Sequence, residues 1–444
     1  TATRAMTVLH ATEPPTVHLA LQARVDGLTI DAVDELLNEQ RTVVKQLAMR
    51  RTLFGFTRDL LPAALGSASA RVAGSELRRL AGDVERAGVA RDGVAWVESA
   101  AADVLAHLGA DGALDVPTLR QQVPALAARI TYGSGKWSQE APVAPRVLTL
   151  LGARGQVFRG RNAGHWRISR PSWTTARAWL GEDPVPLPEA EGYAELVRRW
   201  LWTFGPGTET DLVWWLGATK TTVRRALADV AAAGVELDSG ETGWVLPGDE
   251  KPDEPVEPWA ALLPTLDPTT MGWKQRDFYL DPADVPYLFD SVGNGGTTAW
   301  WCGRVVGCWV QEPDGSVRIV YRTDPGRTAR AALDAEAGRL TEFFAGEVVA
   351  STFAITHLHQ PNHRDQHHPA PNRPTPPSSR APTRDPRQPN DRDITPRPAG
   401  SPCRGRSRSS RPPACGAGSG RTRPRHWSPG RSRSPKPPRA AVRG

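Results

Sequence analysis

The sequence predicts an α+β fold of tandem winged-helix units, followed by a β-rich module and a disordered C-terminal tail. Three observations predict it. A pattern of helix, helix–turn–helix and hairpin occurs twice, at a spacing of about 80 residues. Short β-prone runs separated by glycine-containing turns follow the second copy. From about His357 onward, Pro, Arg, Ser, Gly and His dominate, and little there could be buried to offset the entropy of ordering.

The first copy of the repeat begins near residue 94. Its expected pieces are, in chain order, a helix over Val94–His107, a short helix over Val116–Val123, a helix ending at Ala153, and a hairpin after Gly155 that turns at 162–164 and has Trp166 on its far strand.

The second copy is the clearer one. Its expected pieces are helices over Ala194–Phe204, Glu209–Leu216 and Thr221–Ala232, then a hairpin after Gly234 with Trp244 on its far strand. Thr208 and Asp211 have the spacing of a capping box. An arginine stands nine residues before the hairpin glycine in both copies. This order of elements is that of a winged-helix domain.

Other elements flank the repeat. We expect a helix after the N-cap residue Thr29, a basic hairpin over Val43–Thr57 and a helix around Glu76–Ala87. An acidic, proline-rich linker covers Pro247–Pro258. The last module is expected to contain β-strands at Thr298–Trp301, Val305–Gln311 and Val317–Tyr321, and a helix over Thr328–Phe344.

The positive charge is concentrated in the tail. The formal net charge is +7, but residues 360–444 hold 19 of the 55 Lys and Arg and four of the 48 Asp and Glu. The body is therefore acidic, and any DNA affinity there must come from local basic patches. The tail is either a nucleic-acid-binding arm or out-of-frame translation of a GC-rich gene, which gives the same composition.

Cysteine spacing and hydropathy favour a cytoplasmic, nucleoid-associated protein. Cys302, Cys308, Cys403 and Cys415 make no Cys-x-x-Cys pair, so neither a zinc ribbon nor a disulfide scaffold is expected. No apolar run approaches the roughly 18 residues that span a bilayer, and no signal-peptide core is found near the start. Because the chain begins with Thr1 rather than Met, a further segment upstream of Thr1 is left as an open alternative.

Basic side chains on the repeat are the candidate DNA contacts. The first hairpin carries Arg159, Arg161, Arg167 and Arg170, which either enter a minor groove, where Arg is favoured, or are solvated on an exposed hairpin.

The third helix of the second copy presents Lys220, Thr221 and Arg224, either to a major groove or to packing and protein contacts. The pair Arg50–Arg51 either holds phosphates or forms surface salt bridges.

The clusters of tryptophan and histidine residues predict neither a base-stacking surface nor a metal site. We expect the core to take in most of Trp200, Trp202, Trp214, Trp215, Trp300, Trp301 and Trp309. No metal site is expected from His357, His359, His363, His367 and His368, because a disordered segment holds no fixed coordination geometry.

Five segments in a fixed order carry a family resemblance over roughly residues 8–350. They are LHATEP with LALQARVDGL, QLAMRRTLF, YGSGKWSQEAPVAPRVLTLLGARGQVFRGR, the helix–turn–helix unit and LLPTLDPTTMGWKQRDFYL. Through them the chain resembles the AlkZ/YcaQ-like family of winged-helix DNA glycosylases. The resemblance implies tandem winged-helix domains and a small antiparallel β-barrel-like domain around double-stranded DNA, without a cofactor. We expect a monomer.

The resemblance also implies a division into domains. The expected parts are an N-terminal winged-helix-like domain at 1–92 with the active-site motif, winged-helix domains at 93–185 and 186–248, a linker at 249–258, a β-rich domain at 259–356 and the tail at 357–444.

The resemblance implies excision of N7-alkylguanine, whose positive charge already weakens the glycosidic bond. Members use a Gln-x-Gln or Gln-x-Asp motif, and the matching positions here are His10-Ala11-Thr12, before Glu13. His10 would hydrogen-bond the lesion or a phosphate, and Thr12 would hold a water. Because the amide pair is absent, three functions stay open: a glycosylase, a non-catalytic DNA-binding paralogue that acts as regulator or lesion binder, and a module for protein contacts only.

Overall fold

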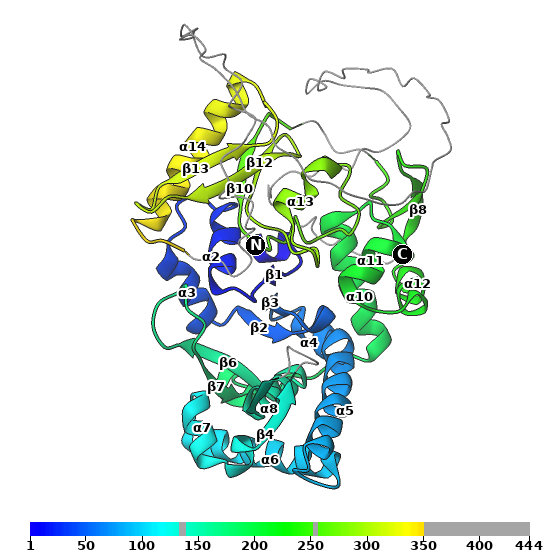
Figure 1. Cartoon of the computed structure of the whole chain (residues 1–444). Helices are drawn as coiled ribbons and strands as arrows, with labels where there is room; N and C mark the ends of the chain where they lie inside the picture. The colour runs from blue at the N-terminus through cyan, green and yellow to red at the C-terminus, as the bar shows by residue number, and fades with distance from the viewer. Residues whose placement is uncertain (133–138, 252–255, 350–444) are drawn as a thin grey trace, which may run out of the picture. The chain divides into compact units, whose positions relative to one another are not determined.

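The structure is a computed structural model that describes residues 1–132, 139–251 and 256–349 (Figure 1). The predicted tail and the histidines at its start lie outside the described residues. None of the helices within these three ranges is both long and apolar enough to cross a membrane.

The N-terminal part contains a small antiparallel sheet. Its elements are α1 (Ala2–Ala5), β1 (Leu9–His10), α2 (Pro14–Gln22), α3 (Ile30–Asn38), β2 (Val43–Leu47) and β3 (Leu53–Thr57). The strand order is β1-β3-β2, and the predicted hairpin is confirmed. The start of α3 is also confirmed, because the Ala32 N–H donates to the Thr29 hydroxyl at 3.2 Å.

The next part contains the helices and hairpin of the first repeat copy. Its elements are α4 (Leu61–Ala64), α5 (Ala70–Arg86), α6 (Gly93–Asp111), α7 (Val116–Gln122), β4 (Arg129–Tyr132), β5 (Gln139–Pro142), α8 (Ala144–Ala153), β6 (Val157–Asn162), β7 (Pro171–Thr175) and α9 (Ala176–Leu180). The helices expected here are confirmed. The β4–β5 pair was not expected.

The second copy follows the expected order closely. Its elements are α10 (Glu189–Phe204), α11 (Glu209–Leu216), α12 (Lys220–Asp229), β8 (Ala233–Glu236) and β9 (Thr242–Val245). The capping box is confirmed: the Asp211 N–H donates to the Thr208 hydroxyl at 3.1 Å, and the Thr208 N–H donates to the Asp211 carboxylate at 3.0 Å. Gly217 ends α11 with a φ of +61°, where glycine costs least.

The two copies share a backbone pairing that closes each hairpin against the helices. Leu114, between α6 and α7, pairs with Trp173 on β7; Gly207, between α10 and α11, pairs with Trp244 on β9. Trp173 is therefore the counterpart of Trp244. The placement of Trp166 on the far strand was wrong, because Trp166 lies in the connection between β6 and β7.

The C-terminal module is an open sheet covered by a helix. It contains β10 (Ala260–Leu263), α13 (Val285–Leu288), β11 (Thr298–Trp301), β12 (Arg304–Gln311), β13 (Val317–Tyr321) and α14 (Arg327–Phe344). The four strands are antiparallel in the order β10-β11-β12-β13, so β10 and β13 are edges and no closed barrel forms from the described strands. The barrel prediction was wrong, because a barrel closes only when its edge strands pair with each other, and the described strands β10 and β13 do not. Leu333, Leu340 and Phe344 of α14 cover the sheet by packing with Trp309.

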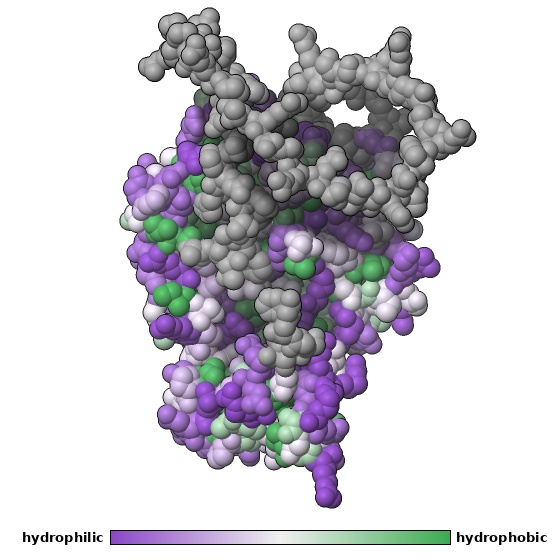
Figure 2. All heavy atoms as spheres, in the orientation of Figure 1, coloured by the Kyte–Doolittle hydropathy of each residue, from purple (hydrophilic) through white to green (hydrophobic). Residues whose placement is uncertain are grey.

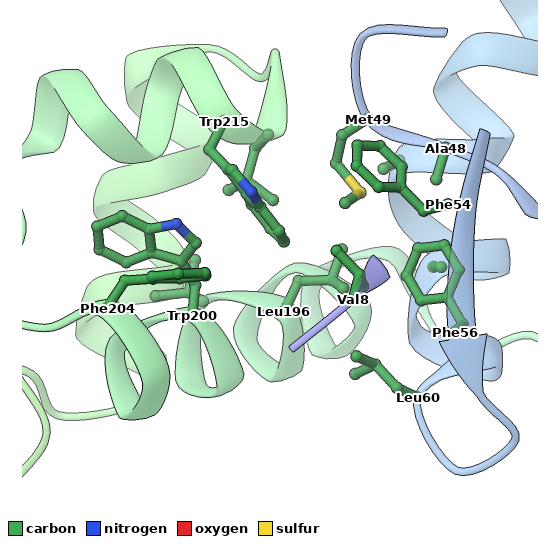
Figure 3. Packing of buried hydrophobic residues seen from close by; sticks show 14 of the residues in the cluster. Val8, Ala48, Met49, Phe54, Phe56, Leu60, Leu196, Trp200, Phe204 and Trp215 are labelled. Carbon is green, nitrogen blue, oxygen red and sulfur yellow. The ribbon is translucent and has the colours of Figure 1, made fainter. Parts of the chain in front are cut away.

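One hydrophobic cluster joins the N-terminal hairpin to α10 and α11. Figure 3 shows Met49 and Phe54 of the hairpin beside Leu196 and Trp215, and all four are buried. This packing fixes the hairpin turn next to the end of α11.

Most of the predicted core tryptophans are confirmed: Trp200, Trp215, Trp300 and Trp309 are buried. Trp202 is 41% exposed, so its assignment to the core was wrong. On the face seen in Figure 2, hydrophobic residues are scattered among hydrophilic ones, as is usual for protein surfaces.

A buried ion pair joins α2 to the segment after β10. The Arg24 guanidinium donates to both oxygens of the Asp267 carboxylate at 2.9 and 2.7 Å, and the two side chains are 3% and 0% exposed. The Thr16 hydroxyl donates to the Thr265 carbonyl nearby. The Thr16 bond holds the start of α2, and the Arg24 pair holds the segment just after its end, so both ends of the helix are fixed against the C-terminal module.

Candidate nucleic-acid interface

The His10-Ala11-Thr12 motif runs from the end of β1 to the start of α2. His10 pairs with Phe54 in the sheet, and the Ala11 N–H donates to the Leu53 carbonyl at 2.9 Å. Thr12 is exposed, whereas Glu13 is buried at the N-cap of α2. The backbone therefore turns outward at Thr12, whose side chain is exposed, whereas only a small part of His10 reaches the surface.

The His10 imidazole is kept neutral. Its ring is 5% exposed and packs edge-on against Phe54, with the ring centroids 5.2 Å apart. Among the residues that the structure describes, its buried Nδ1 has no hydrogen-bond partner. Burial, and to a smaller extent the Arg50 charge, lower the pKa of His10 to about 3. At neutral pH the ring can thus accept or donate a hydrogen bond but does not carry a positive charge.

Arg50 and Arg51 lie in the turn between β2 and β3. Both have left-handed backbone conformations, with φ of 52° and 62°, and such strain in non-glycine residues is concentrated at functional sites. Arg51 pairs with the buried carboxylate of Glu76 at 2.9 Å. Arg50 instead stacks on Trp214 of α11, with the guanidinium carbon 4.1 Å from the ring centroid.

Arg50 keeps its charge although no acidic partner for it is found in the described part of the chain. Burial and the neighbouring Arg276 lower the pKa of Arg50 to about 10, so it is still protonated at neutral pH. Its Nε is buried and has no hydrogen-bond partner in residues 1–132, 139–251 and 256–349. The structure therefore brings together His10 and Arg50, two of the predicted site residues.

The hairpin arginines contact other parts of the chain. Arg159 is half-buried over Trp173, and burial lowers its pKa. Arg161 pairs with Glu39 after α3, and Arg167 pairs with Glu347 at 2.7 Å. Arg170 is exposed, and its backbone N–H donates to Asn162. The hairpin is thus docked onto acidic residues rather than projecting freely.

Lys220 and Arg224 share one acidic neighbour. The Arg224 guanidinium lies 2.6 Å from the Glu209 carboxylate, and the Lys220 ammonium lies 3.9 Å from it. The hydrogen bond from Arg224 lowers the pKa of Glu209. Both cations lie on one face of α12, as predicted, but Glu209 partly neutralises that face.

Two further arginines adjoin Arg50 and were missed in the sequence. The Arg276 guanidinium lies 5.4 Å from the Trp214 ring centroid, and Arg71 donates to the Leu216 carbonyl at 3.0 Å. The only sequence signal was the position of Arg276 inside the WKQRD segment that carries the family resemblance.

A polar cavity of about 450 Å³ lies on the opposite face of the N-terminal sheet. Lys45 is aligned with Gly55 and Leu9, whereas His10 is aligned with Phe54, so strand alternation puts Lys45 and His10 on different faces. The cavity lining includes His18, Asp34, Lys45, Arg161 and Trp166. Burial, and then the Arg159 charge, lower the pKa of Lys45 to about 8.

Comparison with known proteins places this geometry in a family. No curated protein matches the chain. Among solved structures, the DNA glycosylase AlkZ of Streptomyces sahachiroi is similar, with 19% sequence identity and a TM-score of 0.58. The similarity covers 77% of this chain and 90% of that one, which shows a shared fold. The family described as "DNA glycosylase AlkZ-like" matches residues 3–343. The chain belongs to the AlkZ-like DNA glycosylase family.

Proposed function

We propose that this protein binds double-stranded DNA through winged-helix units and removes cationic alkylated purines at a site formed by His10 and Thr12. Family membership supports the substrate class. The observation that carries the site assignment is the neutral, incompletely hydrogen-bonded imidazole of His10 beside the charged Arg50.

The winged-helix assignment rests on the two repeat copies. Each has three helices, a two-stranded hairpin and a bridge from the first interhelical segment to the hairpin tryptophan. The small sheet of a winged helix typically has such a third segment, which pairs with the hairpin; here Leu114 and Gly207 take that place. We keep the division into 1–92, 93–185, 186–248 and 259–356 as part of the proposal.

Excision of a cationic purine needs few catalytic groups. An N7-alkylated purine leaves as a neutral base, so no general acid is needed. Water attacks C1′ of the sugar as the glycosidic bond breaks, and its proton passes to solvent. The Thr12 hydroxyl would position that water, and the neutral His10 ring would hydrogen-bond the substrate without adding to the cationic charge developing on the sugar.

A second candidate function is lesion binding without base release. It is favoured by the 5% exposure of His10 and by Thr12, which has no carboxylate to polarise water. A third candidate, a module for protein contacts, predicts no salt-dependent binding to duplex DNA.

The test uses duplex DNA containing N7-methylguanine. We expect abasic sites to form with the wild-type chain and with His107→Ala, a matched control whose side chain is 39% exposed and lies near Asp111 on α6. His10→Ala and Thr12→Ala should abolish or strongly slow base release. Binding without base release in the wild type would favour the second candidate, and equal activity of His10→Ala and His107→Ala would refute the site.

A further inference from the structure

Three arginines surround the C-terminal end of α11. Arg50 and Arg276 both lie over the indole ring of Trp214, at 4.1 and 5.4 Å from its centroid. Arg71 donates to the Leu216 carbonyl at 3.0 Å and to the Tyr193 hydroxyl at 3.2 Å. We call Arg50, Arg71, Trp214 and Arg276 the arginine–tryptophan cluster.

The cluster differs from the other predicted DNA contacts in its charge balance. Arg51, Arg161, Arg167 and Arg224 each pair with a carboxylate. Within the described ranges, no ion pair is found for any arginine of the cluster. The C-terminal end of α11 offers about half a negative charge through its helix dipole, which does not balance three guanidinium groups.

The geometry leaves donors free to bind a ligand. Arg276 donates to the carbonyls of Thr270 and Gly293 at 3.4 and 3.3 Å, which are long for hydrogen bonds. Arg50 is half-buried and donates no hydrogen bond to the described residues. Stacking on an indole leaves the N–H groups at the edge of a guanidinium available, and it lowers the entropy lost when they bind.

We propose that the arginine–tryptophan cluster binds one phosphodiester of the DNA backbone next to the base that reaches His10. This inference rests on the proposed function. A phosphodiester fits because it relieves the repulsion between neighbouring guanidinium groups, and because planar guanidinium groups match its oxygens. Arg50 is the common member: it touches Trp214 and acts electrostatically on His10. A phosphate held here would fix the DNA register relative to the candidate reaction site.

The test measures binding of the full chain to an N7-methylguanine duplex by fluorescence anisotropy at several salt concentrations. We expect Arg276→Ala to weaken binding about tenfold and to lower the salt slope by about 0.9, the effect of one lost phosphate contact. Arg276→Lys, which keeps the charge but loses the planar fork, should restore the slope but only part of the affinity. Arg330→Ala is the matched control, because Arg330 also stacks on an aromatic ring, Tyr321, and pairs with Asp324.

A scan with single methylphosphonate linkages locates the phosphate. One neutral linkage near the lesion should weaken wild-type binding and have no further effect on Arg276→Ala or Arg50→Ala. If Arg276→Ala does not fold, the same cycle with Arg276→Gln, which removes the charge but keeps most of the side-chain volume, replaces it.

The outcomes separate the two proposals. A wild-type chain that binds and excises but is indifferent to Arg276→Ala and to every neutral linkage overturns the cluster alone. A wild-type chain without salt-dependent duplex binding overturns the proposed function and the cluster together.

Discussion

Burial of a neutral His10 should make the protein less stable in mild acid. The pKa of His10 falls from 6.5 to about 3 in the folded chain. Between these values the unfolded chain binds the proton and the folded chain does not, so the free energy of unfolding falls as the pH drops below 6.5. At about pH 5 the difference is roughly 1.5 pKa units, or about 2 kcal/mol.

His10→Gln isolates this contribution, because the amide does not titrate. We expect the stability lost between about pH 7 and pH 5, measured by urea unfolding, to be smaller in His10→Gln than in the wild type by about 2 kcal/mol. His107→Ala is the control, and it should keep most of the wild-type loss because the His107 side chain, at 39% exposed, is far less desolvated than His10. Equal losses in wild type and His10→Gln would refute the argument, as would an imidazole NMR signal of His10 that titrates near 6.5.

Three further changes test other parts of the structure. Lys45→Met should stabilise the chain by up to about 3 kcal/mol near pH 7. The advantage should shrink as the pH rises from about 8 to 10.5, because the folded wild type has released the proton there while the unfolded chain still binds it, so the wild type gains stability. Asp267→Asn should cost about 3–5 kcal/mol in urea unfolding, because it leaves the buried Arg24 charge unpaired. Glu347→Gln should remove the ion pair of Arg167, although its hydrogen bond to the Val348 carbonyl remains, and should strengthen duplex binding with a steeper salt dependence; unchanged anisotropy curves would contradict this.

Local signals predicted the helices and hairpins well. Thr29 and the Thr208–Asp211 box placed helix starts correctly because an N-cap acts through backbone N–H groups only a few residues away. The predicted bounds of α11, Glu209–Leu216, agree with the structure. Trp166 was misplaced because the connection between β6 and β7 is longer than the predicted turn.

Contacts between distant segments could not be predicted in the same way. The sequence identified Arg161 and Arg167 as basic, but Glu39 and Glu347, which bind them, lie far away along the chain. The open form of the C-terminal sheet could not be predicted either, because strand-forming residues do not show whether the first and last strands pair with each other.

The sequence by itself determined the repeat, most element boundaries, the acidic body with its basic tail, and His10 and Arg50 as candidate site residues. Only the tertiary structure decided that His10 is buried and neutral, and that Arg50, Trp214 and Arg276 meet at the end of α11. The physical reason is the distance along the chain over which each interaction acts. Capping and periodicity act over one or two turns of chain, whereas desolvation and charge pairing depend on which segments pack together.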